Sequence, residues 1–457
     1  MALSRTETET GSDARTAVAE PDVLILGMGL TGASLARYFA RHGVGAVFFD
    51  SRPKPPGIDA ILDAMPDARI HVGAATADIP ASIQRIVVSP GFDLDAPLLA
   101  AGRDKGIEII SDIDLFFADC EAPVIAVTGS NGKSTVTSML AAALSATGLN
   151  AVAGGNLGVP ALDLLQPDVD YYVLELSSFQ LERSGLLPAA AAVVLNISPD
   201  HLDRHGDMRN YAAAKARVYD RCAHAVVNRD EPEFATWSSP DTPVTYFGLG
   251  EPAEGEFGVR KTSGGDCIAL GTDLLVSIDE LPLLGRHNLA NALAAVALGY
   301  ALGVDPHSLA QGLKRFRGLP HRMQLVSRAH GITWIDDSKA TNVGAALMSI
   351  ASVSDPFVLI AGGDAKGAGF DELAGTLGGR RCSAVLMGKD AQIISAALAD
   401  RCPVDIVADM PAAVALAHQR AERGGTVLLA PACSSLDMFD NFAARGDAFA
   451  AAVRGLE

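Results

Sequence analysis

The chain has 457 residues, which corresponds to about three domains of ordinary size. Hydrophobic residues make up 49% of it and charged residues 20%, a balance that suits several buried cores and excludes a disordered chain. The formal charge of −18 repels the phosphates of DNA and RNA, so we expect no nucleic acid as partner.

The N-terminal segment and the cysteines give no sign of export or membrane insertion. Residues 1–20 are polar and lack the apolar segment of a secretory signal, so we expect a flexible tail. No run reaches the roughly 18 uninterrupted apolar residues of a membrane span. The 6 cysteines are scattered without a C-x-x-C pair, which indicates neither a zinc site nor a disulfide framework. We therefore expect a soluble, cytoplasmic, monomeric protein without integral membrane contact.

Strand-like apolar runs alternate with alanine-rich helical stretches along the chain, a pattern typical of parallel sheets covered by helices. In the first unit a helical run, Ala33–Arg41, follows the first strand, and Asp50 ends the second strand. The predicted strands of this unit are Val23–Leu26, Val44–Phe49, Arg85–Ser89 and Ile107–Ile110.

A glycine-rich turn joins the first strand to the first helix. Gly27, Gly29 and Gly32 form a G-x-G-x-x-G, which permits a tight turn and close approach of a diphosphate to the helix N-terminus. Asp50, at the end of the next strand, could meet a ribose hydroxyl. The pattern fits the dinucleotide of a dehydrogenase, a nucleotide-sugar diphosphate, or a tight turn that binds nothing.

The second unit opens with a phosphate-binding loop. The apolar strand Val124–Val127 leads into the sequence TGSNGKST, which ends at Thr135. Its amides can converge on phosphate oxygens, Lys133 can reach the β- and γ-phosphates, and Ser134 or Thr135 can offer a hydroxyl to Mg²⁺. The first glycine comes later than in G-x-x-x-x-G-K-[ST], so the loop is a variant. It predicts an enzyme that binds and consumes ATP.

Two polar groups after strands of the second unit indicate metal binding, and a lysine further along the chain does not do so by itself. Glu175 follows the strand Tyr171–Leu174, where a carboxylate beside a phosphate loop is placed to hold Mg²⁺. His201 lies in a cluster of histidines and acids after the strand Ala192–Asn196, and we expect it to be a metal ligand. Lys215 by itself is typical of a helix-surface lysine, and because an ammonium repels Mg²⁺, it could join a metal site only after chemical modification.

The remaining chain completes the second unit and builds a third. Residues 230–280 have the composition of short strands and turns, an irregular excursion that precedes a helix at Leu289–Leu302. A turn signal at Leu319-Pro320 then starts the third unit. Its predicted strands are Ile332–Ile335, Phe357–Ile360, Ser383–Met387 and Thr426–Ala430.

The predicted fold class is therefore α/β in three domains, with a flexible tail at residues 1–20. We expect a Rossmann-like N-terminal domain at 21–120, a P-loop ATPase domain at 121–318 and a Rossmann-like C-terminal domain at 319–457. Boundaries inferred in this way are good to several residues.

Several motifs together resemble the Mur ligases of peptidoglycan synthesis. These motifs are TGSNGKST, Gly155-Asn156-Leu157-Gly158, Glu175 to Leu181, Asp200 to Arg204, Gly285 to Ala292 and Leu319 to Arg322. The short form of the phosphate loop is also typical of this family. The resemblance covers residues 22–450 and implies three α/β domains that bind, in order, a UDP-sugar, ATP and the incoming amino acid.

The motifs of the third domain resemble the branch of the family that adds D-glutamate. They are Asp336–Asn342, Ala361–Gly367, Pro431–Phe439 and Asn441-Phe442. The resemblance implies ATP-dependent ligation of D-glutamate to UDP-N-acetylmuramoyl-L-alanine through an acyl phosphate, with release of ADP and phosphate. The first glycine loop would then hold UDP and not NAD.

The resemblance also implies roles for single residues. The UDP-sugar would be bound by Leu30, Thr31, Asp50, Ser51, Arg52, Ser89, Gly91 and Asn156. ATP would be bound by Gly129, Ser130, Asn131, Gly132, Lys133, Ser134, Thr135, Asn288, Asn291, Arg322 and Asp337. The D-glutamate pocket would be formed by Thr341, Lys366, Ser435, Leu436 and Phe442. Lys339 would lie near the reacting centre.

Two Mg²⁺ ions are expected beside the phosphates. The first would lie between Ser134, Glu175 and ATP, and the second would use His201 and a carbamylated Lys215. Carbamylation turns the lysine into an anion, which removes the objection to it as a ligand. The catalytic residues would be Lys133, His201, Lys215 and Lys339. The general base stays open, because His201 is one candidate but a metal-bound histidine cannot also accept a proton.

Three other functions remain as alternatives. Another ligase of the superfamily, such as the L-alanine-adding enzyme or folylpolyglutamate synthase, would prefer a different amino acid. An NAD-dependent oxidoreductase would bind NADH and would leave TGSNGKST without a role. A P-loop switch or transport protein would form ADP independently of both co-substrates.

Overall fold

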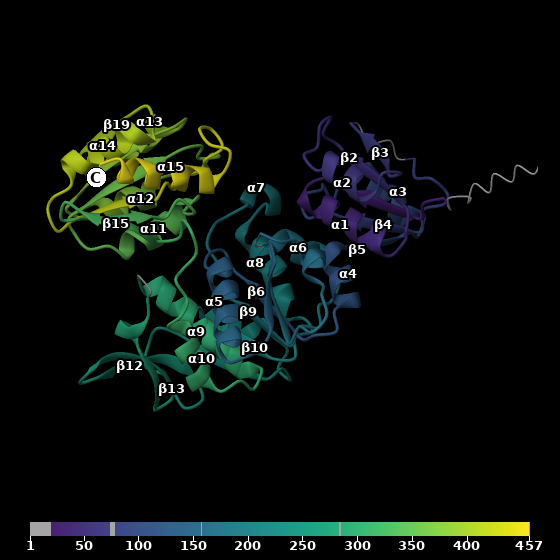
Figure 1. The fold of residues 1–457 in the computed structure, drawn as a ribbon, viewed down its shortest axis with the longest axis horizontal. Coiled ribbons are helices and arrows are strands. Elements are labelled where there is room, and N and C mark those ends of the chain that lie inside the picture. Colours follow the sequence, from purple (N-terminus) through teal and green to yellow (C-terminus); the bar gives the residue numbers. More distant parts are fainter. Residues whose placement is uncertain (1–19, 74–77, 157, 283–284, 457) are drawn as a thin grey trace, which may run out of the picture. The chain divides into compact units, whose positions relative to one another are not determined.

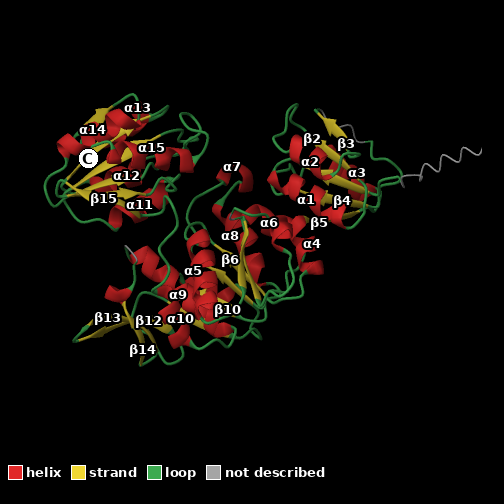
Figure 2. Ribbon diagram, viewed as in Figure 1, coloured by secondary structure: helices red, strands yellow, loops and turns green. Residues whose placement is uncertain are grey.

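The computed structural model describes residues 20–73, 78–156, 158–282 and 285–456, and the chain divides into two compact units between Leu115 and Phe116. The first unit carries one sheet and the second unit carries two (Figure 1). Helices flank strands in all of them, which confirms the predicted α/β fold class (Figure 2). None of the helices in the described ranges has the length and apolar character that a membrane span requires.

A five-stranded parallel sheet forms the first unit, in the order β3-β2-β1-β4-β5. Its strands are β1 Val23–Leu26, β2 Ala46–Asp50, β3 Arg69–Val72, β4 Arg85–Val88 and β5 Glu108–Ser111. Its helices are α1 Leu30–Arg41, α2 Ile58–Ala64, α3 Pro97–Asp104 and α4 Asp112–Asp119, the last of which runs across the division between the units. The strand order reverses between β1 and β4, and ligands of open α/β sheets bind at such a point.

Helix α1 begins at Leu30, earlier than the predicted start at Ala33, because Gly29 already serves as its N-cap. Leu30 and Thr31 therefore belong to the first helical turn. The register pairs Leu26 with Phe49, so the glycine turn after β1 and Asp50 at the end of β2 lie at the same edge of the sheet.

A nine-stranded sheet forms the first half of the second unit, in the order β14-β13-β12-β11-β10-β9-β6-β8-β7. The strands are β6 Val124–Thr128, β7 Ala151–Gly155, β8 Tyr171–Glu175, β9 Ala191–Val194, β10 Ala225–Asn228, β11 Val244–Phe247, β12 Phe257–Thr262, β13 Gly265–Leu270 and β14 Asp273–Ser277. Pairing is parallel from β7 to β12, whereas β12, β13 and β14 pair in antiparallel fashion. The short strands and turns predicted for residues 230–280 are thus present, and strands β11 to β14 extend the sheet instead of forming an irregular excursion.

The helices of this half pack closely on the sheet through small side chains. They are α5 Lys133–Ala146, α6 Ser178–Arg183, α7 Leu202–His205, α8 Met208–Ala216, α9 Arg286–Ala301 and α10 Pro306–Leu313, with 3₁₀ turns η1 Ala161–Leu164, η2 Arg217–Tyr219, η3 Pro232–Thr236 and η4 Ile278–Glu280. Helices α5, α9 and α10 contribute to one core with β6, β8 and β9. A Cβ on Gly312 would lie 2.8 Å from the Cα of Ala143, so α10 approaches α5 too closely for any other residue.

A six-stranded sheet forms the second half, in the order β15-β16-β20-β17-β18-β19, with only the β15–β16 pair antiparallel. Its strands are β15 Gln324–Ala329, β16 Ile332–Asp336, β17 Phe357–Gly362, β18 Cys382–Met387, β19 Val404–Ile406 and β20 Thr426–Leu429. Its helices are α11 Val343–Ala351, α12 Asp371–Leu377, α13 Ala391–Leu398, α14 Met410–Arg420 and α15 Phe442–Arg454. One face of the sheet packs on α11, α12 and α13, and the other packs on α14 and α15. Because β16, β20 and β17 are adjacent and parallel in this sheet, their carboxyl ends are neighbours.

Candidate active site

The phosphate loop lies between β6 and α5. Gly129 and Gly132 have φ angles of 147° and 84°, in the region that favours glycine. A Cβ on Gly132 would lie 2.4 Å from Oδ1 of Asn291, so the loop closes on α9 without room for a side chain. The ammonium of Lys133 folds back and donates to the carbonyl oxygens of Gly129 and Ser130, at 2.9 and 3.0 Å. The loop with its lysine forms a cradle for anionic oxygens.

The polar segment after β9 holds this loop in place. Ser130 Oγ donates to the carbonyl oxygen of Ser198 at 3.0 Å and shares a second hydrogen bond of 3.0 Å with the hydroxyl of Tyr211. The amide of Asn131 donates to Oδ1 of Asn196 at 2.9 Å. The segment that carries the predicted metal histidine is thus fixed directly against the nucleotide loop.

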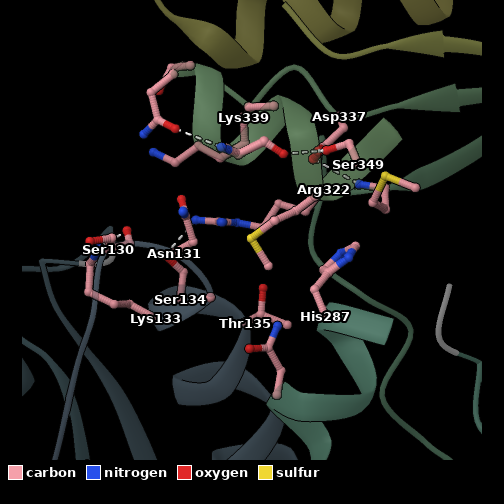
Figure 3. A pocket seen from close by; sticks show the side chains of 18 of the residues that line it. Ser130, Asn131, Lys133, Ser134, Thr135, His287, Arg322, Asp337, Lys339 and Ser349 are labelled. Carbon is pink, nitrogen blue, oxygen red and sulfur yellow. Dashed lines mark hydrogen bonds between the residues drawn. The ribbon is translucent and has the colours of Figure 1, made fainter. Parts of the chain in front are cut away.

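A cavity of about 250 Å³ lies over the phosphate loop and reaches into the C-terminal half (Figure 3). The predicted ATP, metal and catalytic residues that line it are Ser130, Asn131, Gly132, Lys133, Ser134, Thr135, Glu175, His201, Asn288, Asn291, Arg322, Asp337 and Lys339. Asn156 and Thr341, to which the resemblance gives other roles, line it as well. Gly129, which belongs to the loop, and Lys215, which donates to its carbonyl oxygen, are not part of the lining.

Glu175 and Ser134 supply oxygens suited to a metal ion. Glu175 is 3% exposed at the end of β8, and its Oε1 accepts a 2.6 Å hydrogen bond from the amide group of Asn156. Its Oε2 is buried and has no hydrogen-bond partner in the described part of the chain. Ser134 Oγ accepts a 2.7 Å hydrogen bond from Arg322, whose side chain reaches toward it from the C-terminal half (Figure 3). A buried carboxylate oxygen without a donor and a hydroxyl that line the same cavity are a donor set that fits Mg²⁺.

His201 lies at the mouth of the same cavity. It precedes α7 with a φ of 53°, its side chain is about half exposed, and its ring packs edge-on against Phe179 at 4.9 Å. Its Nε2 lies 3.7 Å from Oδ2 of Asp200. No three His, Cys, Asp or Glu side chains within the described ranges are grouped so as to hold a metal ion, so the second metal site stays a prediction.

Lys215 is buried behind the phosphate loop. It belongs to α8, is 1% exposed, and its Nζ donates to the carbonyl oxygen of Gly129 at 2.9 Å. The same nitrogen lies 4.8 Å from the centre of the Tyr211 ring. Burial, followed by the charge of Lys133, lowers the pKa of Lys215 well below its usual value. The expected surface position of an unmodified lysine is therefore wrong, because α8 turns this side chain into the interior.

Buried titratable groups face the cavity from the C-terminal half. Burial lowers the pKa of Lys339 to about 8, and the nearby Arg322 adds to this effect. Burial raises the pKa of Asp337 to about 6, although Ser349 donates a hydrogen bond to its carboxylate. The loop after β16 thus places a lysine that loses its proton easily and a carboxyl that loses its proton with difficulty near the phosphate loop.

Among the lining residues that had no assigned role, His287 is a partly buried titratable group. His287, in the first turn of α9, bonds through Nδ1 to Ser352 Oγ at 2.9 Å, and burial lowers its pKa to about 4. Its imidazole is therefore neutral at physiological pH. The signal in the sequence is its position inside the same motif as Asn288 and Asn291.

The predicted D-glutamate residues lie on the loops that follow β16, β17 and β20 and at the start of α15. Lys366 is exposed with a φ of 49°, Ser435 is buried, and Leu436 is exposed. The Nζ of Lys339 lies 4.2 Å from the centre of the Phe442 ring. Of the five predicted residues only Thr341 lines the cavity over the phosphate loop.

In the first unit Asp50 and the glycine turn form one hydrogen-bonded structure. Asp50 is buried and accepts hydrogen bonds from the amide of Met28 at 2.8 Å and from Nε and Nη2 of Arg52 at 2.9 and 2.7 Å. Burial acts to raise the pKa of Asp50, but the bonds from Arg52 and Met28 lower it below its usual value. A Cβ on Gly32 would lie 2.3 Å from the carbonyl oxygen of Gly27, so the helix starts directly against the turn.

The other predicted UDP residues of this unit share the same sheet edge. Ser89 Oγ donates to the carbonyl oxygen of Gly27 at 3.2 Å, and Leu30 is 78% exposed beside the turn. Thr31, Ser51 and Gly91 follow β1, β2 and β4. Asn156 belongs to the second unit, where it bonds Glu175, so its part in binding the UDP-sugar stays a prediction.

Three family models match consecutive parts of the chain. The model described as Mur ligase MurD-like, N-terminal domain, matches residues 21–111, and the Mur ligase middle domain matches residues 127–299. The model described as Mur ligase, glutamate ligase domain, matches residues 321–433. The glycine turn, the phosphate loop and the loop after β16 each fall within one of these matches.

Full-length relatives and solved structures agree with these matches. The chain is 46% identical to the UDP-N-acetylmuramoylalanine–D-glutamate ligase of Nitrosococcus oceani, over 94% of this chain and 96% of that protein. It is 44% identical to the enzyme of the same name from Methylococcus capsulatus, over 95% of both. The fold is similar to that of UDP-N-acetylmuramate–alanine ligase MurC from Thermotoga maritima, with a TM-score of 0.60 and 16% identity over 95% of this chain and all of that one. The chain therefore belongs to the Mur ligase family.

Proposed function

We propose that this chain joins D-glutamate to UDP-N-acetylmuramoyl-L-alanine with consumption of ATP, releasing ADP and phosphate, in the synthesis of peptidoglycan precursors. The observation that carries the proposal is the cavity in which the phosphate loop faces Lys339 and Thr341. One wall suits a nucleoside triphosphate, and the other belongs to the part matched by the glutamate ligase domain. The acceptor and the amino acid are those in the names of the full-length relatives.

The reaction requires ATP because a carboxylate is a poor electrophile and its oxide is a poor leaving group. Transfer of the γ-phosphoryl group to the carboxylate of the UDP-linked acceptor gives an acyl phosphate and ADP. The amine of D-glutamate attacks the acyl carbon, and a tetrahedral intermediate forms. The C–O bond to phosphate then breaks, the nitrogen loses its proton, and an amide remains.

The cations of the cavity suit these anionic reactants. Burial lowers the pKa values of Lys133, Arg322 and Lys339, so each charge is costly in the free protein. Phosphates and substrate carboxylates would supply the missing negative charge, and the same three groups would then hold the reacting groups together. Asn288 and Asn291, beside the loop on α9, would contact the adenine, and Asp337 the ribose.

Mur ligases use ATP together with Mg²⁺. Glu175 and Ser134 would hold one ion, which would neutralise phosphate charge during transfer. His201 and a modified Lys215 would hold a second. The support for the first pair is the buried, unpartnered Oε2 of Glu175.

Carbamylation of Lys215 is favoured by its surroundings. CO₂ reacts with a neutral amine, and burial together with the charge of Lys133 lowers the pKa of this amine, which favours its neutral form. The product is an anion whose oxygens can ligate Mg²⁺, and it releases one proton. Beside Lys133 it would replace a repulsion between like charges with an attraction.

The acceptor's UDP would bind at the glycine turn of the first unit, where the exposed Leu30 offers an apolar contact to a base. Lys366 would provide a cation for a carboxylate of D-glutamate, within a pocket shared with Thr341 and Ser435. The domain ranges 21–120, 121–318 and 319–457 and the monomeric state belong to this proposal as well.

A panel of substrates tests the function. ADP release should require both UDP-N-acetylmuramoyl-L-alanine and D-glutamate. A preference for L-glutamate or L-alanine would assign the chain to another branch of the superfamily. ADP formation that is independent of both co-substrates would indicate a switch or transport protein. Binding of NADH would support the oxidoreductase alternative.

A further inference from the structure

One arginine of the C-terminal half is almost completely buried. Arg445, in the first turns of α15, is 1% exposed. Its Nε donates to Ser338 Oγ at 3.0 Å and its Nη2 to the Ser338 carbonyl oxygen at 2.8 Å. Its Nη1 donates to the carbonyl oxygens of Cys433 at 3.1 Å and Gly362 at 3.5 Å. A single planar group thus spans three segments that are far apart in the sequence.

These three segments carry the proposed D-glutamate residues. Ser338 precedes Lys339 and Thr341 in the loop after β16. Gly362 ends β17 immediately before the loop with Lys366, and Cys433 precedes Ser435 and Leu436. The hydroxyl of Ser338 also donates to the carbonyl oxygen of Phe442 at 2.7 Å. Each proposed residue therefore lies on a segment that contacts Arg445 directly or through Ser338.

The same loops are also hydrogen-bonded to one another. The amide of Ala432 donates to the carbonyl oxygen of Ala340 at 2.9 Å. Asp364 and Ser434 exchange two backbone hydrogen bonds of 3.0 Å. A change in the position of one loop must therefore move its neighbours.

The charge of Arg445 has no direct counter-ion. Within the described ranges no carboxylate forms an ion pair with it, and its partners are carbonyl and hydroxyl oxygens. Burial lowers its pKa to about 10, an effect that the nearby Cys433, Asp437 and Asp336 only partly offset, so the group is still cationic at neutral pH. A buried cation without a counter-ion costs free energy that an apolar side chain would avoid. Next to the loops proposed to bind an amino acid with two carboxylates, both the planar set of donors and the charge of Arg445 have a use.

We propose that Arg445 is the positioning residue of the D-glutamate pocket. Its guanidinium fixes the relative positions of the loops with Thr341, Lys366 and Ser435, and it acts on the substrate through them. This inference rests on the proposed function, because it takes D-glutamate as the substrate.

The variant Arg445→Lys distinguishes the effect of the planar set of N–H donors from the effect of the positive charge. Lysine keeps the cation but carries its donors on one nitrogen, which cannot span the three segments. We expect the KM for D-glutamate to rise about tenfold or more, because hydrogen bonds from a charged group are lost. The KM for ATP should rise less than the KM for D-glutamate, because Arg445 contacts the ATP site only through Ser338, which lies between Asp337 and Lys339, and does not contact the phosphate loop.

Ser338→Ala is a milder second variant. It removes only the hydroxyl that joins Arg445 to Phe442. We expect the KM for D-glutamate to rise in the same direction while kcat at saturating D-glutamate changes less. Addition of guanidinium ions should partly restore the D-glutamate KM of Arg445→Ala but not that of Ser338→Ala.

Arg380→Lys is the matched control. Arg380 also joins separate parts of the chain, because it donates to the backbone carbonyl oxygen of Val353 at 2.8 Å and to the side-chain Oδ1 of Asp355 at 2.7 Å. It stacks on Phe357 at the opposite, amino end of β17. The control should lose thermal stability without a selective rise in the KM for D-glutamate.

The outcomes distinguish the inference from the function on which it rests. Absence of D-glutamate-dependent ADP release by the unaltered protein would overturn the proposed function. If the unaltered protein is active, an unchanged D-glutamate KM in Arg445→Lys and Ser338→Ala would overturn the positioning role, as would an equal rise for all three substrates. If Arg445→Lys does not fold, the KM values of Ser338→Ala decide the question alone.

Discussion

Lys133 and Lys215 donate hydrogen bonds to the same carbonyl oxygen, that of Gly129, over 2.9 Å in each case. Two ammonium groups on one oxygen repel each other, and neither has an ion-pair partner in the described part of the chain. Burial first, and Lys133 second, lower the pKa of Lys215. The arrangement is relieved if Lys215 is neutral, and it becomes attractive if Lys215 carries a carbamate.

Replacement of Lys215 by alanine should lower kcat by about two orders of magnitude or more, because the proposed carbamate ligand to a second Mg²⁺ would be lost. A short-chain carboxylate such as acetate should restore part of the activity by occupying the vacated position. Lys133→Ala is the control, since it should abolish turnover without rescue and leave thermal unfolding little changed. Full activity of Lys215→Ala in the absence of added carboxylate would contradict the carbamate.

The contact between Gly132 and Asn291 predicts a second effect. Gly132→Ala would place a methyl group 2.4 Å from Asn291 Oδ1 at a φ of 84°. ATP affinity should fall by about 100-fold or more, because the loop must open to relieve both the contact and the backbone strain. The affinity is measured by equilibrium titration with a non-hydrolysable ATP analogue.

Gly303→Ala serves as the control for Gly132→Ala. Gly303 has a φ of 82° but nothing within 4 Å of its added Cβ. It should lose about 1–2 kcal/mol of stability from backbone strain alone and keep normal ATP affinity. Equal affinities in the two variants would mean that the close contact with α9 does not matter for the nucleotide.

Much of the fold could be predicted from the sequence because central parallel strands are uninterrupted apolar runs. The strands beginning at Val23 and Val124 were predicted within a residue of their observed bounds. Five strands were missed: β3, β7, β10, β15 and β19. Four of them, β3, β7, β15 and β19, lie at sheet edges and are partly exposed, so their sequences carry a weak strand signal. The fifth, β10, is a buried apolar run and was overlooked although it carries the same signal as the other central strands.

The site was predictable where its chemistry is local. The phosphate loop could be placed because its residues are consecutive in the sequence and because its glycines permit the backbone angles of a tight turn. The bond between Arg322 and Ser134 joins residues 188 positions apart, and nothing in either local sequence indicates it. Arg445 likewise stands in a helix start whose composition suits a surface arginine, and only the packing of α15 buries it.

The pKa of Lys339 predicts an alkaline limit to activity. Burial lowers this pKa from 10.5 to about 8, so the cation is present below that pH and is lost as the pH rises through it. The kcat/KM for ATP reports on the free protein and should therefore fall above about pH 8. Lys339→Arg keeps its charge at higher pH and should shift the limit upward. An unchanged profile in this variant would assign the limit to another group, such as Lys133.

Asp337 should lower the stability of the protein at neutral pH. Burial raises the pKa of Asp337 from 3.8 in the unfolded chain to about 6 in the folded protein. The protonated carboxyl therefore favours the folded state fully below about pH 4, and this contribution to the free energy of unfolding is lost as the pH rises through 6. The two-unit shift corresponds to about 3 kcal/mol, part of which hydrogen bonds lost on substitution will offset. Asp337→Asn should thus raise the free energy of unfolding by about 1–2 kcal/mol at pH 8, with a smaller gain at pH 5.

The same variant should bind ATP more weakly, because Asp337 lines the nucleotide cavity. Asp355→Asn is the contrasting control. Hydrogen bonds from the Arg381 amide and the Arg380 side chain lower the pKa of Asp355, so this substitution should destabilise the protein at pH 8 and leave ATP affinity unchanged. Urea denaturation at pH 5 and pH 8 measures both effects. If Asp337→Asn instead lowered the free energy of unfolding at pH 8, the buried carboxylate would not destabilise the folded protein. Its burial would then need no explanation from nucleotide binding.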